Sequence, residues 1–243
     1  EISCPGARDA MFNMDDSKIF TTCQQEPKGM AVIDVESRKE IKMVPIKGGR
    51  AGGMDPQGKY FMVSASKSVH FFDSQTAEHV KTIKVPGGGG NFTCLKDGSK
   101  CYVGLRKANA VGVIDMAKLE LMKTIETGPD ANRLYLNPGN SRYGLFANEA
   151  GKSDIVSIID TQKDVKVKDI WTGLGPHNVA FDPDGKFAVI STKKENVATL
   201  VDTASADPNE WDVITTDLDS GIQNNGVRWV PSPAALKKAL AQN

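Results

Sequence analysis

The sequence has no surplus of charge of either sign. Its 30 lysines and arginines balance its 30 aspartates and glutamates, so the formal net charge at pH 7 is zero. Proteins that bind nucleic acid need a basic surface against the phosphates, and this balance argues against such a partner. The sequence also lacks any apolar run near the roughly 20 residues that span a bilayer. We therefore expect a soluble protein with no nucleic-acid partner and no membrane insertion.

Common catalytic and cofactor motifs are also missing. The sequence contains no Gly-x-Ser-x-Gly elbow, no Gly-x-x-x-x-Gly-Lys phosphate loop and no Cys-x-x-Cys pair, so it gives no sign of the nucleophile, nucleotide, haem-attachment or zinc sites that use them. Histidine is scarce, with only His70, His79 and His177. They fall in different parts of the repeat pattern described below, so we predict neither a metal nor a cofactor.

The four cysteines, Cys4, Cys23, Cys94 and Cys101, are disulfide candidates. Cys94 and Cys101 flank Leu-Lys-Asp-Gly-Ser-Lys, a strand–turn–strand pattern that brings them across one hairpin. Cys4 and Cys23 lie together in the first repeat. Disulfides imply a periplasmic or extracellular protein. The alternative is four buried free thiols, and the sequence leaves the connectivity open.

The most informative feature is internal repetition. An apolar pair followed by aspartate recurs every 39 to 45 residues, at Val32-Ile33-Asp34, Phe71-Phe72-Asp73, Val113-Ile114-Asp115, Ile158-Ile159-Asp160 and Leu200-Val201-Asp202. This period is typical of propeller blades. We interpret the five aspartates as structural, because an Asx side chain at a turn normally bonds nearby backbone.

Two further elements accompany each aspartate. A turn such as Asp55-Pro56-Gln57-Gly58 or Asp182-Pro183-Asp184-Gly185 precedes it and indicates a hairpin. A last alternating strand carries a lysine, at Lys42, Lys81, Lys123 and Lys168. A charge on an outermost strand discourages edge-to-edge pairing, and we predict that these lysines serve that purpose.

Together these elements resemble the YVTN family of propeller repeats, whose consensus is a Ser-Pro-Asp-Gly-type turn, a Tyr-Val-like strand, a Val-Ile-Asp strand and a closing Ile-x-Val-Gly. The resemblance implies an all-β propeller of four-stranded blades, in a family that includes scaffolds, subunits of redox complexes and surface proteins. We place five complete blades at about 7–48, 49–88, 89–128, 129–174 and 175–220, within one domain spanning 1–243.

The two ends of the sequence predict a partial sixth blade. Residues 1–6 resemble the end of a fourth strand, residues 221–233 resemble a first strand, and 234–241 has the composition of a short helix. A shared sixth blade would close the ring and remove its free edges. Two of its strands are then missing: either residues upstream supplied them, or the last blade is incomplete, or the ring has five blades and an extra strand.

Ligands of propellers are expected where the loops entering the innermost strands converge around the axis. Aligning the repeats on their turns places a polar and mildly basic set there: Arg8, Arg50, Asn132, Arg133, His177, Asn178 and Asn225. Such a set can hold a carboxylate or phosphate through charge-assisted hydrogen bonds. The alternative is that these side chains only satisfy backbone groups or hold channel water.

The functional hypothesis is a non-catalytic periplasmic or extracellular propeller, which binds a protein partner or a small anionic ligand at this axial face. A role as a subunit of a redox complex would fit the family resemblance. The alternative is a propeller enzyme, a lactonase-like hydrolase or a cofactor-processing protein, that uses His177 and the arginines in the axial funnel. Few carboxylates accompany them in the alignment, so we assign no catalytic residue.

Overall fold

The structure, a computed structural model, describes residues 2–195 and 197–219. These residues form five four-stranded sheets in succession, each with its strands in chain order and every neighbouring pair antiparallel. The predicted all-β propeller of four-stranded blades is therefore confirmed. Within the described ranges, no helix has the length and hydrophobicity needed to cross a membrane.

Each blade is a continuous stretch of chain. Blade 1 contains β1 (Ala7–Phe12), β2 (Lys18–Cys23), β3 (Gly29–Asp34) and β4 (Lys39–Pro45). Blade 2 contains β5 (Ala51–Met54), β6 (Tyr60–Ser64), β7 (Ser68–Asp73) and β8 (His79–Lys84). Blade 3 contains β9 (Phe92–Cys94), β10 (Lys100–Leu105), the 3₁₀ turn η1 (Arg106–Ala108), β11 (Ala110–Asp115) and β12 (Glu120–Glu126). Blade 4 contains β13 (Ala131–Leu136), β14 (Tyr143–Asn148), β15 (Ile155–Asp160) and β16 (Val165–Trp171). Blade 5 contains β17 (Pro176–Phe181), β18 (Phe187–Thr192), β19 (Val197–Asp202), the turn η2 (Pro208–Glu210) and β20 (Asp212–Asp219).

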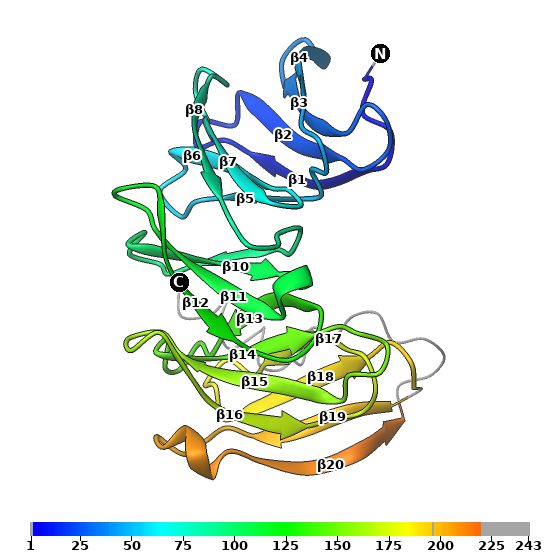
Figure 1. The fold of residues 1–243 in the computed structure, drawn as a ribbon, viewed down its shortest axis with the longest axis vertical. Coiled ribbons are helices and arrows are strands. Elements are labelled where there is room, and N and C mark those ends of the chain that lie inside the picture. Colours follow the sequence, from blue (N-terminus) through cyan, green and yellow to red (C-terminus); the bar gives the residue numbers. More distant parts are fainter. Residues whose placement is uncertain (1, 196, 220–243) are drawn as a thin grey trace, which may run out of the picture.

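The five blades are arranged as an arc. First strands of successive blades pack together, β1 with β5, β5 with β9 and β9 with β13, while β17 packs on β14. Blade 1 and blade 5 lie at opposite ends of the longest axis (Figure 1). The C-terminal part of the predicted sixth blade, 221–233, and the predicted helix 234–241 lie outside the described residues, so ring closure stays a prediction.

Residues Ile2–Gly6 form no strand and are attached to blade 1. The backbone amide and hydroxyl of Ser3 both donate to the Glu40 carboxylate on β4. Cys4 forms a disulfide with Cys23 at the end of β2. This short segment therefore packs on the blade that it precedes.

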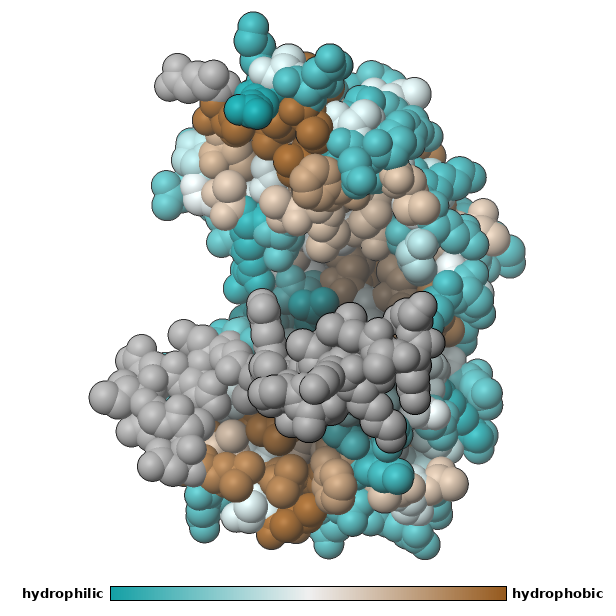
Figure 2. All heavy atoms as spheres, turned by 180° about the vertical axis from the view of Figure 1, so that it is seen from behind, coloured by the Kyte–Doolittle hydropathy of each residue, from teal (hydrophilic) through white to brown (hydrophobic). Residues whose placement is uncertain are grey.

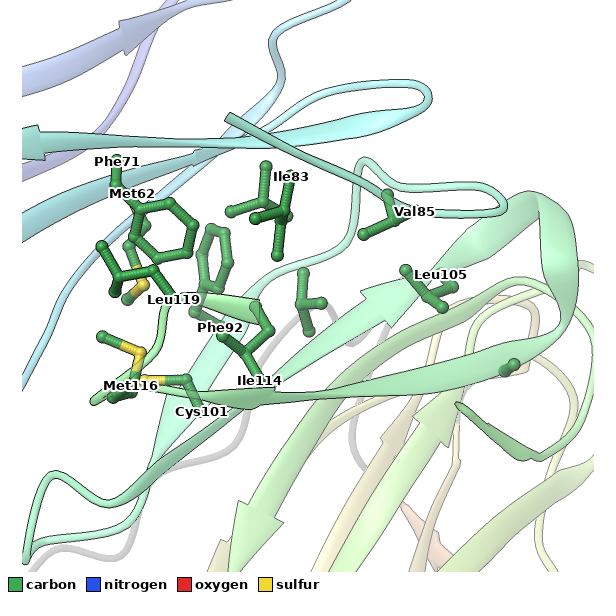
Figure 3. Close-up of a cluster of buried hydrophobic side chains, with 13 residues drawn as sticks. Met62, Phe71, Ile83, Val85, Phe92, Cys101, Leu105, Ile114, Met116 and Leu119 are labelled. Atoms are coloured by element: carbon green, nitrogen blue, oxygen red, sulfur yellow. The ribbon is translucent and has the colours of Figure 1, made fainter. Parts of the chain in front are cut away.

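The hydrophobic core is divided among the spaces between blades. The cluster between blades 2 and 3 is representative, with Met62, Phe71 and Ile83 from one sheet facing Cys101 and Ile114 of the next (Figure 3). Blades 2, 3 and 4 thus bury both faces against their neighbours, which is why second and third strands such as β6 and β11 are nearly continuous apolar runs instead of alternating ones.

The repeated aspartates are structural, as predicted. Asp34 accepts hydrogen bonds from the amide and hydroxyl of Ser37, and Asp73 accepts from the amides of Gln75 and Thr76. Asp115, Asp160 and Asp202 accept backbone amides two or three residues ahead in the same way. Each carboxylate therefore fixes the turn between the third and fourth strands of its blade.

The disulfides are present as well. Cys94 and Cys101 occupy opposite positions of the β9–β10 pair and are bonded to each other, while Cys4 is bonded to Cys23. No cysteine is left free. The first bridge joins two adjacent strands, whereas the second fixes the segment before β1.

Three of the four outer-strand lysines also bond the neighbouring blade, which the sequence did not predict. The Lys42 ammonium donates to the Ala77 carbonyl oxygen of the following blade at 2.9 Å. Lys81 donates to the Lys118 carbonyl in the same way, and Lys168 to the carbonyls of Asn209 and Trp211. These three lysines join neighbouring blades, because in an arc each outer strand lies beside the turn of the next blade.

This role predicts an effect on stability. Replacing Lys168 by methionine keeps the aliphatic stem but removes two charge-assisted hydrogen bonds, so we expect the free energy of unfolding to fall by about 1–2 kcal/mol. Lys123 is the matched control, because no such bond is seen for it among the described residues. Urea denaturation of Lys168→Met and Lys123→Met measures both. Equal losses would contradict the inter-blade role.

Candidate functional site

A buried carboxylate is the centre of a polar network that joins three blades. Glu149 directly follows β14, and only 4% of its side chain is exposed. Its oxygens lie 3.2 Å from Nη1 of Arg106, 3.2 Å from Nζ of Lys193 and 3.1 Å from Nε2 of His177. Asn132 on β13 donates to it through its side-chain amide. Blades 3, 4 and 5 thus meet at one carboxylate.

The surroundings of Glu149 keep it ionised. Burial by itself raises its pKa, but the hydrogen bond from His177 and the positive charges of Lys193 and Arg106 outweigh burial. The pKa is lowered from 4.5 to about 2 as a result. A buried carboxylate with this many donors is a fixed negative charge at neutral pH.

Arg106 bonds two carboxylates at once. Besides Glu149 it pairs with Asp130, which precedes β13. Asp130 has a left-handed backbone, with φ of 58°, and its backbone amide donates a hydrogen bond to the Asn109 side-chain oxygen at 3.2 Å. Arg106 is only 15% exposed in its side chain, so its position is fixed by both partners.

The network continues toward blade 1 through two asparagines. Asn91 donates through its side chain to Asn132 at 3.3 Å and accepts from Nη2 of Arg8 at 3.5 Å. Arg8 also lies 3.4 Å from the neighbouring Asp9 carboxylate.

The backbones approach closely at this point because of two glycines. The Asn91 amide donates to the Asn132 carbonyl across the blade boundary. A Cβ on Gly90 would meet Gly104 at 2.5 Å, and one on Gly104 would meet the Asn132 carbonyl oxygen at 2.2 Å. The glycine run 87–90, in the connection between β8 and β9, therefore makes room for this contact.

Arg50 differs from the other cations of the network. Its Nη1 donates to the Gly89 carbonyl at 3.1 Å, and within the described residues it has no carboxylate within 4.0 Å. Its pKa is lowered, first by burial and then by the positive charges of Arg106 and Arg8. A half-buried guanidinium next to two others is an unfavourable arrangement that an anion would relieve.

The structure brings together four of the predicted site residues. Arg8, Asn132 and His177 belong to the network around Glu149, and Arg50 adjoins it, since the Thr22 hydroxyl lies within hydrogen-bond distance of the carbonyls of both Arg8 and Arg50. Asn225 lies outside the described residues.

Arg133 and Asn178 lie to one side of this network. Arg133 is exposed, and its guanidinium lies 5.4 Å from the centre of the Tyr135 ring. The Tyr135 hydroxyl donates to the Asn178 side chain. Arg133 and Tyr135 line a hollow of about 330 Å³ together with Phe181 of the next blade. Among the described residues, no group of three acidic, histidine or cysteine side chains is arranged to hold a metal.

Sequence reasoning missed Arg106, Glu149 and Lys193. Each directly follows the second strand of its blade, β10, β14 or β18. We aligned only the starts of the first strands, although an antiparallel neighbour ends beside them. A charged residue directly after an apolar second strand is the signal that would have identified all three.

Comparisons with known proteins support the fold and leave the activity open. No family model matches the chain. A curated relative, antigen Lp49 of Leptospira interrogans serogroup Icterohaemorrhagiae serovar copenhageni, is 24% identical over 141 residues, which are 55% of this chain and 30% of the antigen. The match thus spans less than a third of that relative.

Two solved structures have a similar fold. A chain of Kuenenia stuttgartiensis hydrazine synthase matches with a TM-score of 0.60 and 17% identity, covering 95% of this chain and 91% of that one. A functionally unknown protein from Desulfotomaculum acetoxidans DSM 771 matches with a TM-score of 0.65 and 14% identity, covering 82% of this chain and 66% of that one. At these identities the likeness concerns the fold alone.

Proposed function

We propose that this propeller is a binding protein that holds a small anionic ligand at the mouth formed by Arg8, Arg50 and the Glu149 network. The observation that carries the proposal is the charge of Arg50. Arg8, Arg106 and Lys193 each have a carboxylate neighbour, whereas Arg50 has only a carbonyl among the described residues. A carboxylate or phosphate would supply the missing partner through two parallel hydrogen bonds.

Anion binding can be measured directly. We expect inorganic phosphate or citrate to raise the melting temperature of the protein at constant ionic strength, and calorimetric titration to give the dissociation constant. Replacing Arg50 by glutamine should weaken binding at least about tenfold, since one charge-assisted pair contributes at least about 1.4 kcal/mol. The control is Arg38→Gln, at an exposed arginine in the turn before β4. Equal affinities in the two variants would exclude this site.

The wider proposal is a YVTN-type propeller that works outside the cytoplasm with a protein partner. The five repeats with their turn aspartates support the repeat type, and the two disulfides support an oxidising compartment. The similarity to a hydrazine synthase chain motivates the idea of a subunit of a redox complex. Native mass measurement tests it: a solitary monomer with no retained ligand would argue against this proposal.

One contact favours the enzyme alternative. His177 lies 3.1 Å from the Glu149 carboxylate, and a carboxylate that orients an imidazole is a common arrangement for a general base. A lactonase-like hydrolase or cofactor-processing enzyme using this pair should lose turnover in His177→Gln while keeping phosphate binding. If His177→Gln loses only phosphate binding and the native protein shows no turnover, the result would support the binding function over the enzyme alternative.

A further inference from the structure

Two of the three histidines meet on the outer strands of blade 2. The ring centres of His70 on β7 and His79 on β8 lie 6.3 Å apart. The sequence predicted no metal, because the histidines fall in different parts of the repeat, but antiparallel pairing of β7 with β8 brings these two together. Strand β8 lies on the convex side of the arc, where most of the surface is hydrophilic (Figure 2). His79 is exposed and His70 is partly buried.

Both imidazoles direct a ring nitrogen at the same oxygen. Nδ1 of His70 lies 3.0 Å from the Thr82 hydroxyl, and Nε2 of His79 lies 2.7 Å from it. A hydroxyl has one proton, so it can donate to only one of the two ring nitrogens. A metal ion between the rings accepts the lone pairs of both. In the parts of the chain that the structure describes, neither ring has a carboxylate within 4.0 Å that would compete for it.

The other ring nitrogen of His70 has a partner that fixes the ring. Nε2 of His70 lies 2.9 Å from the hydroxyl of Ser68, two residues earlier on the same strand. When Nε2 carries the proton and donates it to Ser68, Nδ1 keeps the free lone pair that faces Thr82 and His79. Histidines that bind metals almost always have such a hydrogen bond on the second nitrogen. Ser68 is thus a positioning residue for His70.

A β-bulge places the two histidines on one face of the sheet. The register of β7 with β8 shifts between Phe71 and Phe72, which leaves Val80 without a partner in the pairing. In a regular strand, residues three apart point to opposite faces, and His79 would then point away from Thr82. The pairing of third and fourth strands shifts in every blade. The backbone geometry therefore belongs to the repeat, and the two imidazoles are particular to blade 2.

Blade 4 shows how the same three positions look in a cluster whose charges are matched. There, the places of His70, Thr82 and His79 are taken by Ser157, Asp169 and Lys166. The Asp169 carboxylate accepts from the Ser157 hydroxyl at 2.6 Å and from the Lys166 ammonium at 2.9 Å. Blade 2 has instead two nitrogen ligands on either side of a neutral hydroxyl.

We propose that His70 and His79 bind a divalent transition-metal ion between Nδ1 of the first ring and Nε2 of the second, with the Thr82 hydroxyl turned aside. Imidazole nitrogen is a good ligand for Zn²⁺, Ni²⁺ and Cu²⁺, and Cu²⁺ binds it most strongly of the three. Two protein ligands are fewer than the three or four of resident zinc sites. Water fills the other coordination positions, so the ion is exchangeable. The site is on the outer strands of blade 2 and does not depend on the anion site.

Calorimetric titration with Cu²⁺, with glycine as a competing chelator, tests the proposal. We expect the native chain to bind the ion at least about tenfold more tightly than His70→Gln or His79→Gln, since each substitution removes one of the two ligands. The matched control is Thr82→Val, which removes the hydroxyl but keeps both imidazoles. It should bind Cu²⁺ as tightly as the native chain, whereas a pair that only holds β7 and β8 together through Thr82 would show a loss of stability and no metal binding.

A second measurement needs no substitution and so does not depend on the folding of a variant. In proton NMR spectra of the native chain, Cu²⁺ well below one equivalent should broaden the ring resonances of His70 and His79 and leave those of His177 sharp. Native binding no tighter than that of the double variant His70→Gln/His79→Gln would overturn the proposal. So would broadening that begins at His177, because the ion would then bind at the Glu149 network.

Discussion

Replacing Glu149 by glutamine is expected to lower the free energy of unfolding by about 3 kcal/mol at pH 7. The substitution keeps the size of the side chain but leaves Arg106 and Lys193 without their shared negative charge in a part of the molecule where both are mostly buried. Removing one member of a buried ion pair typically costs about 3–5 kcal/mol. Urea denaturation measures the loss. Glu36→Gln, at an exposed glutamate in the turn after β3, is the control.

The same residue predicts a pH dependence. Glu149 has a pKa of about 2 in the folded protein and an ordinary value of 4.5, so the unfolded chain binds more protons between these values. Its stabilising contribution is therefore complete above about pH 4.5 and is lost as the pH falls toward 2, amounting to about 3 kcal/mol. Several aspartates also have lowered pKa values, so the difference between native protein and Glu149→Gln isolates this carboxylate. A difference that does not shrink below pH 4.5 would show that Glu149 is not the buried, ionised centre.

Replacing Lys100 by methionine is expected to destabilise the protein by a similar amount, about 3 kcal/mol. The Lys100 ammonium lies 2.8 Å from the Asp164 carboxylate of the next blade and 2.8 Å from the Thr161 carbonyl. Tyr102 donates to the same carboxylate at 2.6 Å, and burial raises the pKa of that phenol. The substitution leaves Asp164 charged and mostly buried, with the phenol of Tyr102 as its only remaining side-chain donor among the described residues.

An exposed pair provides the comparison. Lys118 lies 3.9 Å from Asp115, and 72% of its side chain is exposed. Because solvent screens such pairs, Lys118→Met should cost no more than about 0.5 kcal/mol. Thermal or urea unfolding of Lys100→Met and Lys118→Met under the same conditions measures the two losses of stability. If both lysine variants lose equally little stability, the Lys100 contact does not hold blades 3 and 4 together.

The candidate site was only partly predictable. Arg8, Arg50, Asn132 and His177 were found because the repeat sets where each first strand begins. Glu149 was not found, because the repeats were compared only at the starts of their first strands, whereas Glu149 directly follows the second strand β14. Its four donors come from positions 17 to 44 residues away, and their convergence depends on the angle between successive blades.

The sequence by itself determined the kind of sheet and its repetition. Turn aspartates, hairpin signals and apolar strands are local features, and each acts within one blade of about 40 residues. The tertiary structure decided which charges meet: it turned the outer-strand lysines into inter-blade contacts, placed Arg133 against Tyr135 and left Arg50 without a carboxylate among the described residues. The physical reason is that contacts within a blade depend on sequence spacing, whereas contacts between blades depend on the angle at which the twisted sheets pack. Sequence spacing alone does not determine that angle.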